Sequence, residues 1–498
     1  MKTNKFVALL FAGLMTLATL TGCGGNSNVD DGTGKEWESL KNNDLVQIEF
    51  WGRDEGTEEV NYRNYINTFN SEHQNIVVSV HWDTDSQSYN SALDGKGNNL
   101  PDVFMLSNAM FTSYAASGKL ANIRSHVDNA VLNDLYENAY EVYYFDHSSK
   151  KVGKTDSAAL YGLPKDQGPY ALCYNEDLLT KAANAYNATA AEKDKIDLGR
   201  VTDTKNPMTF SDFIDLGKKL KTQLKTGTEA EYVCSGYDME SAVYSNNANF
   251  FTDDSGRTAA IDSDNFVGAI SFMQNLYKEG ILPSAGTSSQ NAENLFKQGR
   301  AIFFYAGPWK QKTYWKEIDV DTNAKRFTWN ILPVLCGDAE GSVSTAYMGG
   351  MCYAISRICK YKDAALELVK YLSADSGSQR NQYRSGQCIP NLKSLAEEYA
   401  TDSKGLIGGK NPINRGVWID CVNGTSETDK ITAKYRAASY TFTDTWQTNL
   451  VTDMRTGEYG SFWEAKDGQW VDVKAALTAY KPTMQEALDN DARRLDRM

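Results

Sequence analysis

A tryptophan directly behind a Gly-Pro turn is the side chain best placed for binding chemistry in this sequence. Trp309 follows Gly307-Pro308, which closes an apolar run of strand length, Ala301–Tyr305. In open α/β sheets, ligands bind in the crevice outside the carboxyl ends of the strands, so an indole at this point would face a crevice. The alternative is that Trp309 caps the edge of a core, where a large apolar ring would also be buried.

A second group of binding side chains follows another apolar run. The group combines an aromatic ring, a planar guanidinium with several donors and two carboxylates, from Trp51, Arg53, Asp54 and Glu55. Asn108 follows a later strand-like run. Such groups can pair with ligand hydroxyls. For Arg53 and Asp54, a solvated surface turn would explain the sequence equally well.

The elements that must position these groups alternate between strand and helix. Apolar runs predict strands at Val46–Phe50, Ile76–Trp82 and Pro101–Leu106, and three-and-four spacing predicts a helix at Thr57–His73. Strands separated by helices indicate a parallel sheet covered on both faces. The fold class is therefore predicted to be α/β.

A second unit is predicted to begin near Tyr161–Asp166, where Gly and Pro interrupt the pattern, and Asp166 is a further candidate contact. Thr209–Asp212 has the spacing of a capping box and predicts the start of a helix. Asp262–Glu279 has helical apolar spacing, and Gly280 should end that helix.

Two adjacent glycines interrupt a later strand-like run. Gly349 and Gly350 lie inside Ala346–Ile355. Glycine weakens strand packing, but it lets the backbone swivel or approach a ligand closely. This pattern favours a crossing between two units that acts as a hinge.

The N-terminus is predicted to be a targeting segment. Lys2 and Lys5 precede the apolar run Phe6–Leu20, which is shorter than the ~20 residues of a membrane span. Leu20-Thr-Gly-Cys23 resembles a bacterial lipobox, which implies cleavage after residue 22, a lipid on Cys23 and attachment to the outer side of the membrane. Residues 23–43 then form a flexible tether. An ordinary secretory cleavage site is the alternative.

Composition limits the partners. The formal net charge is −13 at pH 7, from 51 Lys and Arg against 64 Asp and Glu, so nucleic acid should be repelled. The seven cysteines after Cys23 are odd in number and contain no C-x-x-C pair, so neither a disulfide framework nor a zinc site is indicated. We expect no metal and no cofactor, and we interpret these cysteines as small buried hydrophobic residues.

From about Val46 to the C-terminus the chain resembles the extracellular sugar-binding lipoproteins of bacterial ABC importers, the group that includes maltose- and multiple-sugar-binding proteins. The motifs that carry the resemblance occur in the order and spacing of that group. They are Pro101-Asp-Val-Phe104, Ser117-Gly-Lys-Leu120, Tyr161-Gly-Leu-Pro164, Tyr174-Asn-Glu-Asp-Leu178, Phe296 with Gly299, Gly307-Pro-Trp309, Leu332-Pro333, Gly349-Gly350 and Ile389-Pro-Asn-Leu-Lys393.

The resemblance implies a two-lobed periplasmic-binding-protein-like fold of the class II type, with a mostly parallel sheet flanked by helices in each lobe and hinge crossings between them. Lobe 1 would be residues 44–165 and 349–404, and lobe 2 residues 166–348 and 405–498. In maltose-binding relatives the tryptophan of the Gly-Pro-Trp turn stacks on a sugar ring, and Trp309 matches it.

The resemblance also carries over the remaining contacts. Arg53, Asp54 and Glu55 match charged groups that hydrogen-bond the sugar, and Asn108 matches a third-strand contact. Further aromatic platforms could be Trp418 and Tyr440, for which core packing is equally consistent with the sequence. At Met105 and Asn108-Ala-Met the chain departs from the maltose-binding pattern, which argues against maltose itself.

The sequence therefore predicts a monomeric carrier that closes around an oligosaccharide with low-micromolar affinity, about −8 kcal/mol, and delivers it to the transmembrane subunits of an ABC permease. The first alternative is a lipid-anchored glycoside-active enzyme with paired carboxylates. The sequence has no Gly-x-Ser-x-Gly elbow and no His-Glu-x-x-His motif, so we expect a protein that is not an enzyme. A surface adhesin for polymeric glycan is the second alternative.

Overall fold

The computed structural model describes residue 37 and residues 45–53, 58–224, 231–252, 256–319, 326–424, 431–435, 445–457 and 460–497. All of them belong to one compact unit, Gly32–Met498. Cys23 and the segment before it lie outside the described residues, so the predicted signal peptide and lipid site stay predictions. In the described part of the chain, no helix is both long and apolar enough to cross a membrane.

The first sheet is mixed and holds the predicted N-terminal strands. Its order is β13-β12-β3-β1-β2, and β7 also pairs with β12. β1 runs parallel to β2 and β3, as predicted, while β12 runs antiparallel to β3 and β7 and parallel to β13. The strands are β1 (Val46–Arg53), β2 (Ile76–Asp83), β3 (Val103–Ser107), β7 (Gly162–Pro169), β12 (Ser344–Ile355) and β13 (Ile431–Tyr435).

The second sheet differs from the mostly parallel arrangement that was predicted. β8 runs antiparallel to both β10 and β11, and only β9 and β10 are parallel. The reason lies in the connection: a single residue, Tyr170, separates β7 from β8, so β8 enters this sheet without a crossover helix. The order is β11-β8-β10-β9, with β8 (Ala171–Asn175), β9 (Tyr232–Cys234), β10 (Ala301–Ala306) and β11 (Trp329–Leu332).

A small third sheet has the order β5-β4-β6, with β4 (Tyr144–Asp146), β5 (Lys151–Val152) and β6 (Ala159–Leu160). The Asp146 carboxylate holds the loops around it by accepting hydrogen bonds from Ser148, Thr155 and Ser157.

Helix ends agree with the sequence signals. Thr209 and Asp212 form the predicted capping box at the start of α8, and Ser263 caps α10. Gly280 ends the α10 region with φ +60, which glycine adopts at little cost. The N-terminal helices are α1 (Glu59–Glu72), α2 (Ser86–Gly95), α3 (Asn108–Ala116), α4 (Asn129–Asp134), α5 (Glu137–Glu141), α6 (Glu176–Asn187), α7 (Leu198–Val201), α8 (Phe210–Lys221), α9 (Met239–Ser245) and α10 (Asp264–Lys278).

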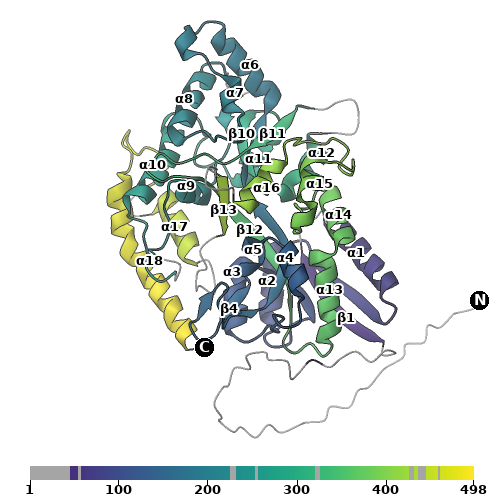
Figure 1. Ribbon diagram of the computed structural model, residues 1–498. Coiled ribbons are helices and arrows are strands. Elements are labelled where there is room, and N and C mark those ends of the chain that lie inside the picture. Colours follow the sequence, from purple (N-terminus) through teal and green to yellow (C-terminus); the bar gives the residue numbers. More distant parts are fainter. Residues whose placement is uncertain are drawn as a thin grey trace, which may run out of the picture. The chain divides into compact units, whose positions relative to one another are not determined.

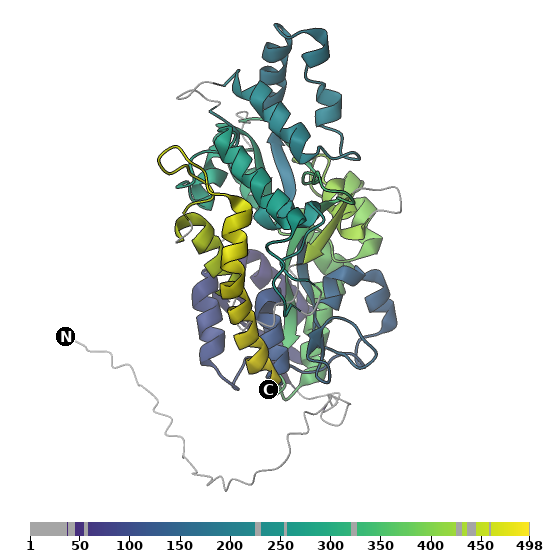
Figure 2. The same cartoon turned by 90° about the vertical axis from the view of Figure 1, so that its left-hand side faces the viewer.

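The later helices cover both sheets. In Figure 1, α6, α7 and α8 lie together beyond β10 and β11, and Figure 2 shows the long α18 along α10, against which it packs. The helices after α10 are α11 (Ser289–Lys297), α12 (Gln311–Glu317), α13 (Lys362–Ala374), α14 (Ser376–Arg384), α15 (Ala396–Thr401), α16 (Gly416–Asn423), α17 (Thr445–Thr456) and α18 (Val473–Asp496). The 3-10 turns are η1 (Glu192–Asp194), η2 (Pro308–Lys310) and η3 (Lys393–Leu395).

Two hydrophobic cores meet at the second sheet. Along β8, Ala171 and Cys173 belong to one core, while Leu172 and Tyr174 belong to the other. This alternation is the period of a strand that is buried on both faces. The seven cysteines after Cys23 are all buried, which confirms their interpretation as small buried residues.

Candidate functional site

Two turns with the same Gly-Pro-aromatic sequence meet where the chain passes between the sheets. Gly307-Pro308-Trp309 leads from β10 into η2, and Gly168-Pro169-Tyr170 joins β7 to β8. The Trp309 indole lies on Gly168 so closely that a Cβ there would come within 2.5 Å of its Cζ3 atom. The ring centroids of Trp309 and Tyr170 are 5.3 Å apart.

Two more tyrosines complete what we call the aromatic platform: Tyr170, Tyr305, Trp309 and Tyr347. The Tyr170 ring lies 4.9 Å from Tyr305 and 5.6 Å from Tyr347, measured between centroids. All four side chains are half-buried. Trp309 is therefore not fully buried in a core.

The platform tyrosines stay protonated over the physiological range. Burial raises the pKa of Tyr170 well above its usual value, and the nearby carboxylates of Asp238 and Glu240 raise it further. Burial and Asp238 also raise the pKa of Tyr305. Neutral phenols can donate a hydrogen bond to a ligand oxygen or accept one from a ligand hydroxyl.

An ion pair adjoins Trp309 in the sequence and in space. Lys310 Nζ lies 3.0 Å from Glu293 Oε2, and the two side chains are only 26% and 13% exposed. The other carboxylate oxygen, Glu293 Oε1, is buried and has no hydrogen-bond partner among the described residues. Charged groups of both signs thus lie beside the platform.

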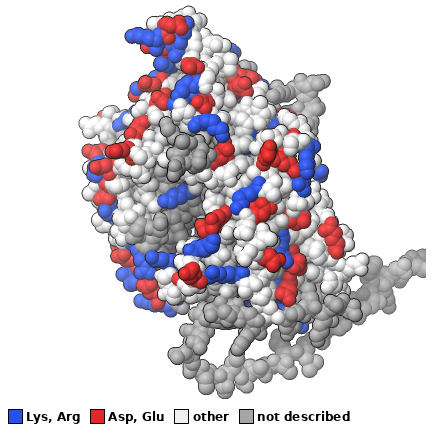
Figure 3. Space-filling model, viewed as in Figure 1, with Lys and Arg blue, Asp and Glu red and all other residues white. Residues whose placement is uncertain are grey.

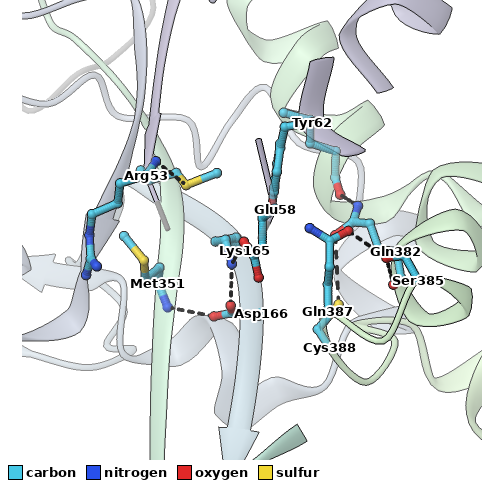
Figure 4. Close-up of polar contacts among 12 residues, drawn as sticks. Arg53, Glu58, Tyr62, Lys165, Asp166, Met351, Gln382, Ser385, Gln387 and Cys388 are labelled. Atoms are coloured by element: carbon cyan, nitrogen blue, oxygen red, sulfur yellow. Dashed lines mark hydrogen bonds and ion pairs between the residues drawn. The ribbon is translucent and has the colours of Figure 1, made fainter. Parts of the chain in front are cut away.

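Earlier in β7, the strand that leads to Tyr170, a buried ion cluster surrounds Lys165, as Figure 4 shows. Lys165 Nζ lies 2.6 Å from Asp166 Oδ2 and 3.3 Å from Glu58 Oε2. Burial alone would lower the pKa of Lys165, but the two carboxylates raise it well above its usual value, so the ammonium stays charged. The other oxygen, Asp166 Oδ1, accepts a hydrogen bond from the backbone N of Met351 at 3.1 Å, at an irregularity in the β7 and β12 pairing.

The structure buries two of the predicted aromatic contacts, Trp51 and Trp418. Trp51 is 6% exposed, donates to Glu49 at 2.7 Å and stacks on His81, so its ring is packed. Trp418 is 1% exposed because α16 packs against the first core, which disagrees with its prediction as a platform.

Other predicted residues lie at the expected ends of strands. Arg53 ends β1, contacts the Ser86 hydroxyl and lies over the Tyr89 ring at 5.9 Å. Asn108 begins α3 directly after β3 and is half-buried. Gly349 and Gly350 pair with Gly168 and Gln167 of β7. Asp54, Glu55 and Tyr440 lie outside the described residues.

Three platform residues were not predicted from the sequence as ligand contacts. Tyr170, Tyr305 and Tyr347 lie in or beside apolar runs and were interpreted only as strand residues. The repeated Gly-Pro-aromatic pattern was a usable signal for Tyr170, because the same pattern singled out Trp309.

The charged and metal-binding side chains of the described residues bear on the expectation of no metal and no nucleic acid. No cluster of three His, Cys, Asp or Glu side chains suited to a metal occurs among the residues that the structure describes. On the face shown in Figure 3, acidic and basic side chains are interspersed.

The comparisons with known proteins agree with this geometry. The family model for the bacterial extracellular solute-binding protein matches residues 64–406. The chain belongs to this family. One relative is the galactooligosaccharide-binding protein of Bacillus subtilis (strain 168), which is 26% identical over 344 residues. The match covers 67% of this chain and 70% of that protein.

Solved structures of solute-binding proteins show the same two-lobed α/β fold. The sugar-binding protein MalE from Xanthomonas citri has a TM-score of 0.64 at 17% identity, with 91% of this chain and 100% of that chain covered. UgpB from Mycobacterium tuberculosis, in complex with glycerophosphocholine, has a TM-score of 0.65 at 15% identity, with 90% and 99% covered. This family consists of binding proteins, so the enzyme alternative receives no support.

Proposed function

We propose that this solute-binding protein captures a neutral oligosaccharide on the aromatic platform and delivers it to an ABC permease. The observation that carries the proposal is the meeting of the Trp309 and Tyr170 turns, with four half-buried rings, where the chain crosses between the sheets. The galactooligosaccharide-binding relative supports the ligand class.

The chemistry of the platform suits a sugar. A pyranose presents an apolar C–H face and a rim of hydroxyls, so it is bound by aromatic faces together with planar or hydroxyl partners. Trp309 supplies the largest face, and the protonated hydroxyls of Tyr170 and Tyr305 supply partners. The carboxylates of Asp238 and Glu240 nearby disfavour an anionic ligand.

The two lobes would close around the ligand through their crossings. Lobe 1 would hold residues 44–165 and 349–404, and lobe 2 residues 166–348 and 405–498. A ligand that contacts both lobes stabilises the closed form by its greater affinity for that form. Asn108 and Arg53 of lobe 1 are half-buried candidates for the opposing contacts.

The location of the protein follows from the N-terminal motif. A lipid on Cys23 would hold the protein at the outer side of the membrane by burial of its chains. The tether that would let it reach the permease would end before Trp37, because that indole stacks on His126 with ring centroids 3.7 Å apart. The protein would work as a monomer, with no cofactor.

The experiment is calorimetry of the mature protein against a panel of neutral oligosaccharides, including galactotriose and maltotriose. At least one should bind with low-micromolar affinity, about −8 kcal/mol. Trp309→Ala should weaken that binding by about 100-fold, since buried aromatic anchors contribute most of such interfaces. Trp470→Ala is the matched control, because this half-buried indole packs over Lys278 in a different region. Failure of the whole panel to bind would overturn the proposal, as would wild-type affinity in Trp309→Ala.

A further inference from the structure

Helix α9 replaces a neighbouring strand along the start of β12. The Ser245 hydroxyl accepts from the Thr345 backbone N at 2.9 Å and donates to the Thr345 carbonyl at 3.2 Å. One helical turn earlier, the Ser241 hydroxyl accepts from the Tyr347 backbone N at 2.9 Å. Both serines are fully buried, so these bonds satisfy backbone groups that water cannot reach.

The partners of β12 change in the middle of the strand. Ser344–Met348 pair with β13, whereas Met351–Ile355 pair with β3. Among the residues that the structure describes, the strand that pairs with Gly349 and Gly350 is β7. The first part of β12 is thus held by α9 and β13 and its last part by β3 and β7, and of the described strands β7 alone pairs with the two glycines between these parts.

The same serines connect to the platform. The Tyr170 backbone N donates to the Tyr347 carbonyl at 2.9 Å, and the Tyr347 N donates to Ser241. Asp238 caps α9 by accepting from the Ser241 backbone N at 2.6 Å. A series of hydrogen bonds therefore runs from the start of α9 to the backbones of two platform residues, Tyr347 and Tyr170.

We propose that Ser241 and Ser245 are positioning residues that fasten β12 to α9, so that bending between the lobes is confined to Gly349 and Gly350 and the platform moves as one body with α9. This inference rests on the proposed function, because it assigns a mechanical role beside the same binding site. Two rigidly held halves with an intervening pair of glycines form a hinge in the usual structural sense. Positioning the rings before the ligand arrives lowers the entropy lost on binding.

The test measures bending without a ligand. Spin labels at Glu72→Cys in α1 and Lys181→Cys in α6 report the distance between exposed sites of the two lobes. The native cysteines after Cys23 are buried, so they should not take up label. In the full mature chain, the double variant Ser241→Ala/Ser245→Ala should widen the distance distribution relative to the parent.

Binding and exchange measurements separate a positioning role from a merely structural one. The double variant should bind galactotriose about 10-fold more weakly, and the single variant Ser241→Ala should show an intermediate effect if the double variant does not fold. Amide exchange at Thr345 and Tyr347 should become faster whether the serines position the platform or only stabilise the fold, since each amide loses its acceptor.

Ser235→Ala is the matched control. The Ser235 hydroxyl is buried in the same region but has no hydrogen-bond partner among the described residues, so its removal should leave the distance distribution unchanged. Faster exchange with an unaltered distance distribution would overturn the inference. Lack of galactotriose binding by the parent protein would count against the proposed ligand, while the distance measurement would still decide the role of the serines.

Discussion

The first and last parts of β7 perform different tasks within one strand. Lys165 is held in a buried ion cluster, and the neighbouring Gln167, fully buried, donates to the Pro390 carbonyl at 3.2 Å. Asn391 binds the carbonyls of Pro164 and Lys165 as well. Three residues after Gln167 and directly after the end of β7 comes Tyr170, whose ring is half-buried beside Trp309.

The difference teaches that one continuous strand can be fixed at one end and available for binding at the other. Polar partners around Lys165 come from Glu58, directly before α1, and from Asn391, in the segment before η3, and they hold the strand in place. Gly168 has no side chain and so admits the Trp309 indole. Substitutions at the first end should therefore lower stability, and substitutions at the second end should lower affinity.

The largest expected effect belongs to the fixed end. Lys165→Met would leave the carboxylates of Glu58 and Asp166 without their shared cation in a buried setting. Breaking a buried pair in this way destabilises a protein by about 3–5 kcal/mol, so the free energy of unfolding should fall by about that amount. Urea denaturation of the ligand-free protein measures it.

The control is an exposed ion pair of similar length. Lys154 lies 2.6 Å from Glu137, but the two side chains are 42% and 60% exposed. Lys154→Met should change the free energy of unfolding by less than about 1 kcal/mol. Equal effects of the two substitutions would show that the Lys165 cluster does not fix the strand.

A smaller effect is expected at the binding end. Gly168→Ala would place a Cβ 2.5 Å from Trp309 Cζ3 and 2.7 Å from Cε3, so the indole must shift. Calorimetry with the oligosaccharide found for the parent should show about 10-fold weaker binding, about 1.4 kcal/mol. The thermal midpoint should change little, because the half-buried ring can move outward.

Gly286 provides the matched substitution, since a Cβ there meets no atom within 4 Å. Gly286→Ala should leave both affinity and thermal midpoint unchanged. If Gly168→Ala bound the ligand as tightly as the parent, Trp309 would not need its present position, and the comparison between the two ends of β7 would fail.

The sequence was sufficient to predict the elements whose signals are local. The strand before Trp309 and the capping box at Thr209 depend on neighbouring residues, and both were found as predicted. The antiparallel course of β8 could not be predicted from strand and helix alternation, because it depends on the direct entry of the chain from β7.

The candidate site was predictable only in part, for a related reason. Trp309 was recognised from its turn, and its ring is half-buried as a ligand-facing ring requires. Trp418 resembles it in type but lies on a helix face covered by the core, a property set by tertiary packing. Tyr347 belongs to the platform because β12 packs against α9, which lies about a hundred residues earlier in the chain. No local sequence pattern predicts such a contact.

The smallest expected effect is that of pH, which should change neither the stability provided by the Lys165 end of β7 nor the affinity provided by the Tyr170 end. The pKa of Lys165 and the pKa of Tyr170 are both raised in the folded protein, as is that of Tyr305. A raised folded-state pKa gives stability that is complete below the unfolded-state value, about 10 for these groups, and is lost as the pH rises through the folded-state value.

From pH 7 to 9.5 we therefore expect the affinity to stay within about twofold and the free energy of unfolding to show no loss from these three groups. Calorimetry and urea denaturation across this range measure both quantities, and the absorbance of tyrosinate in Tyr170→Phe and Tyr305→Phe identifies the phenols that titrate late. A fall in affinity alone by pH 9 would mean that a platform phenol ionises while the ion cluster is intact, because only the binding end would then have lost a proton.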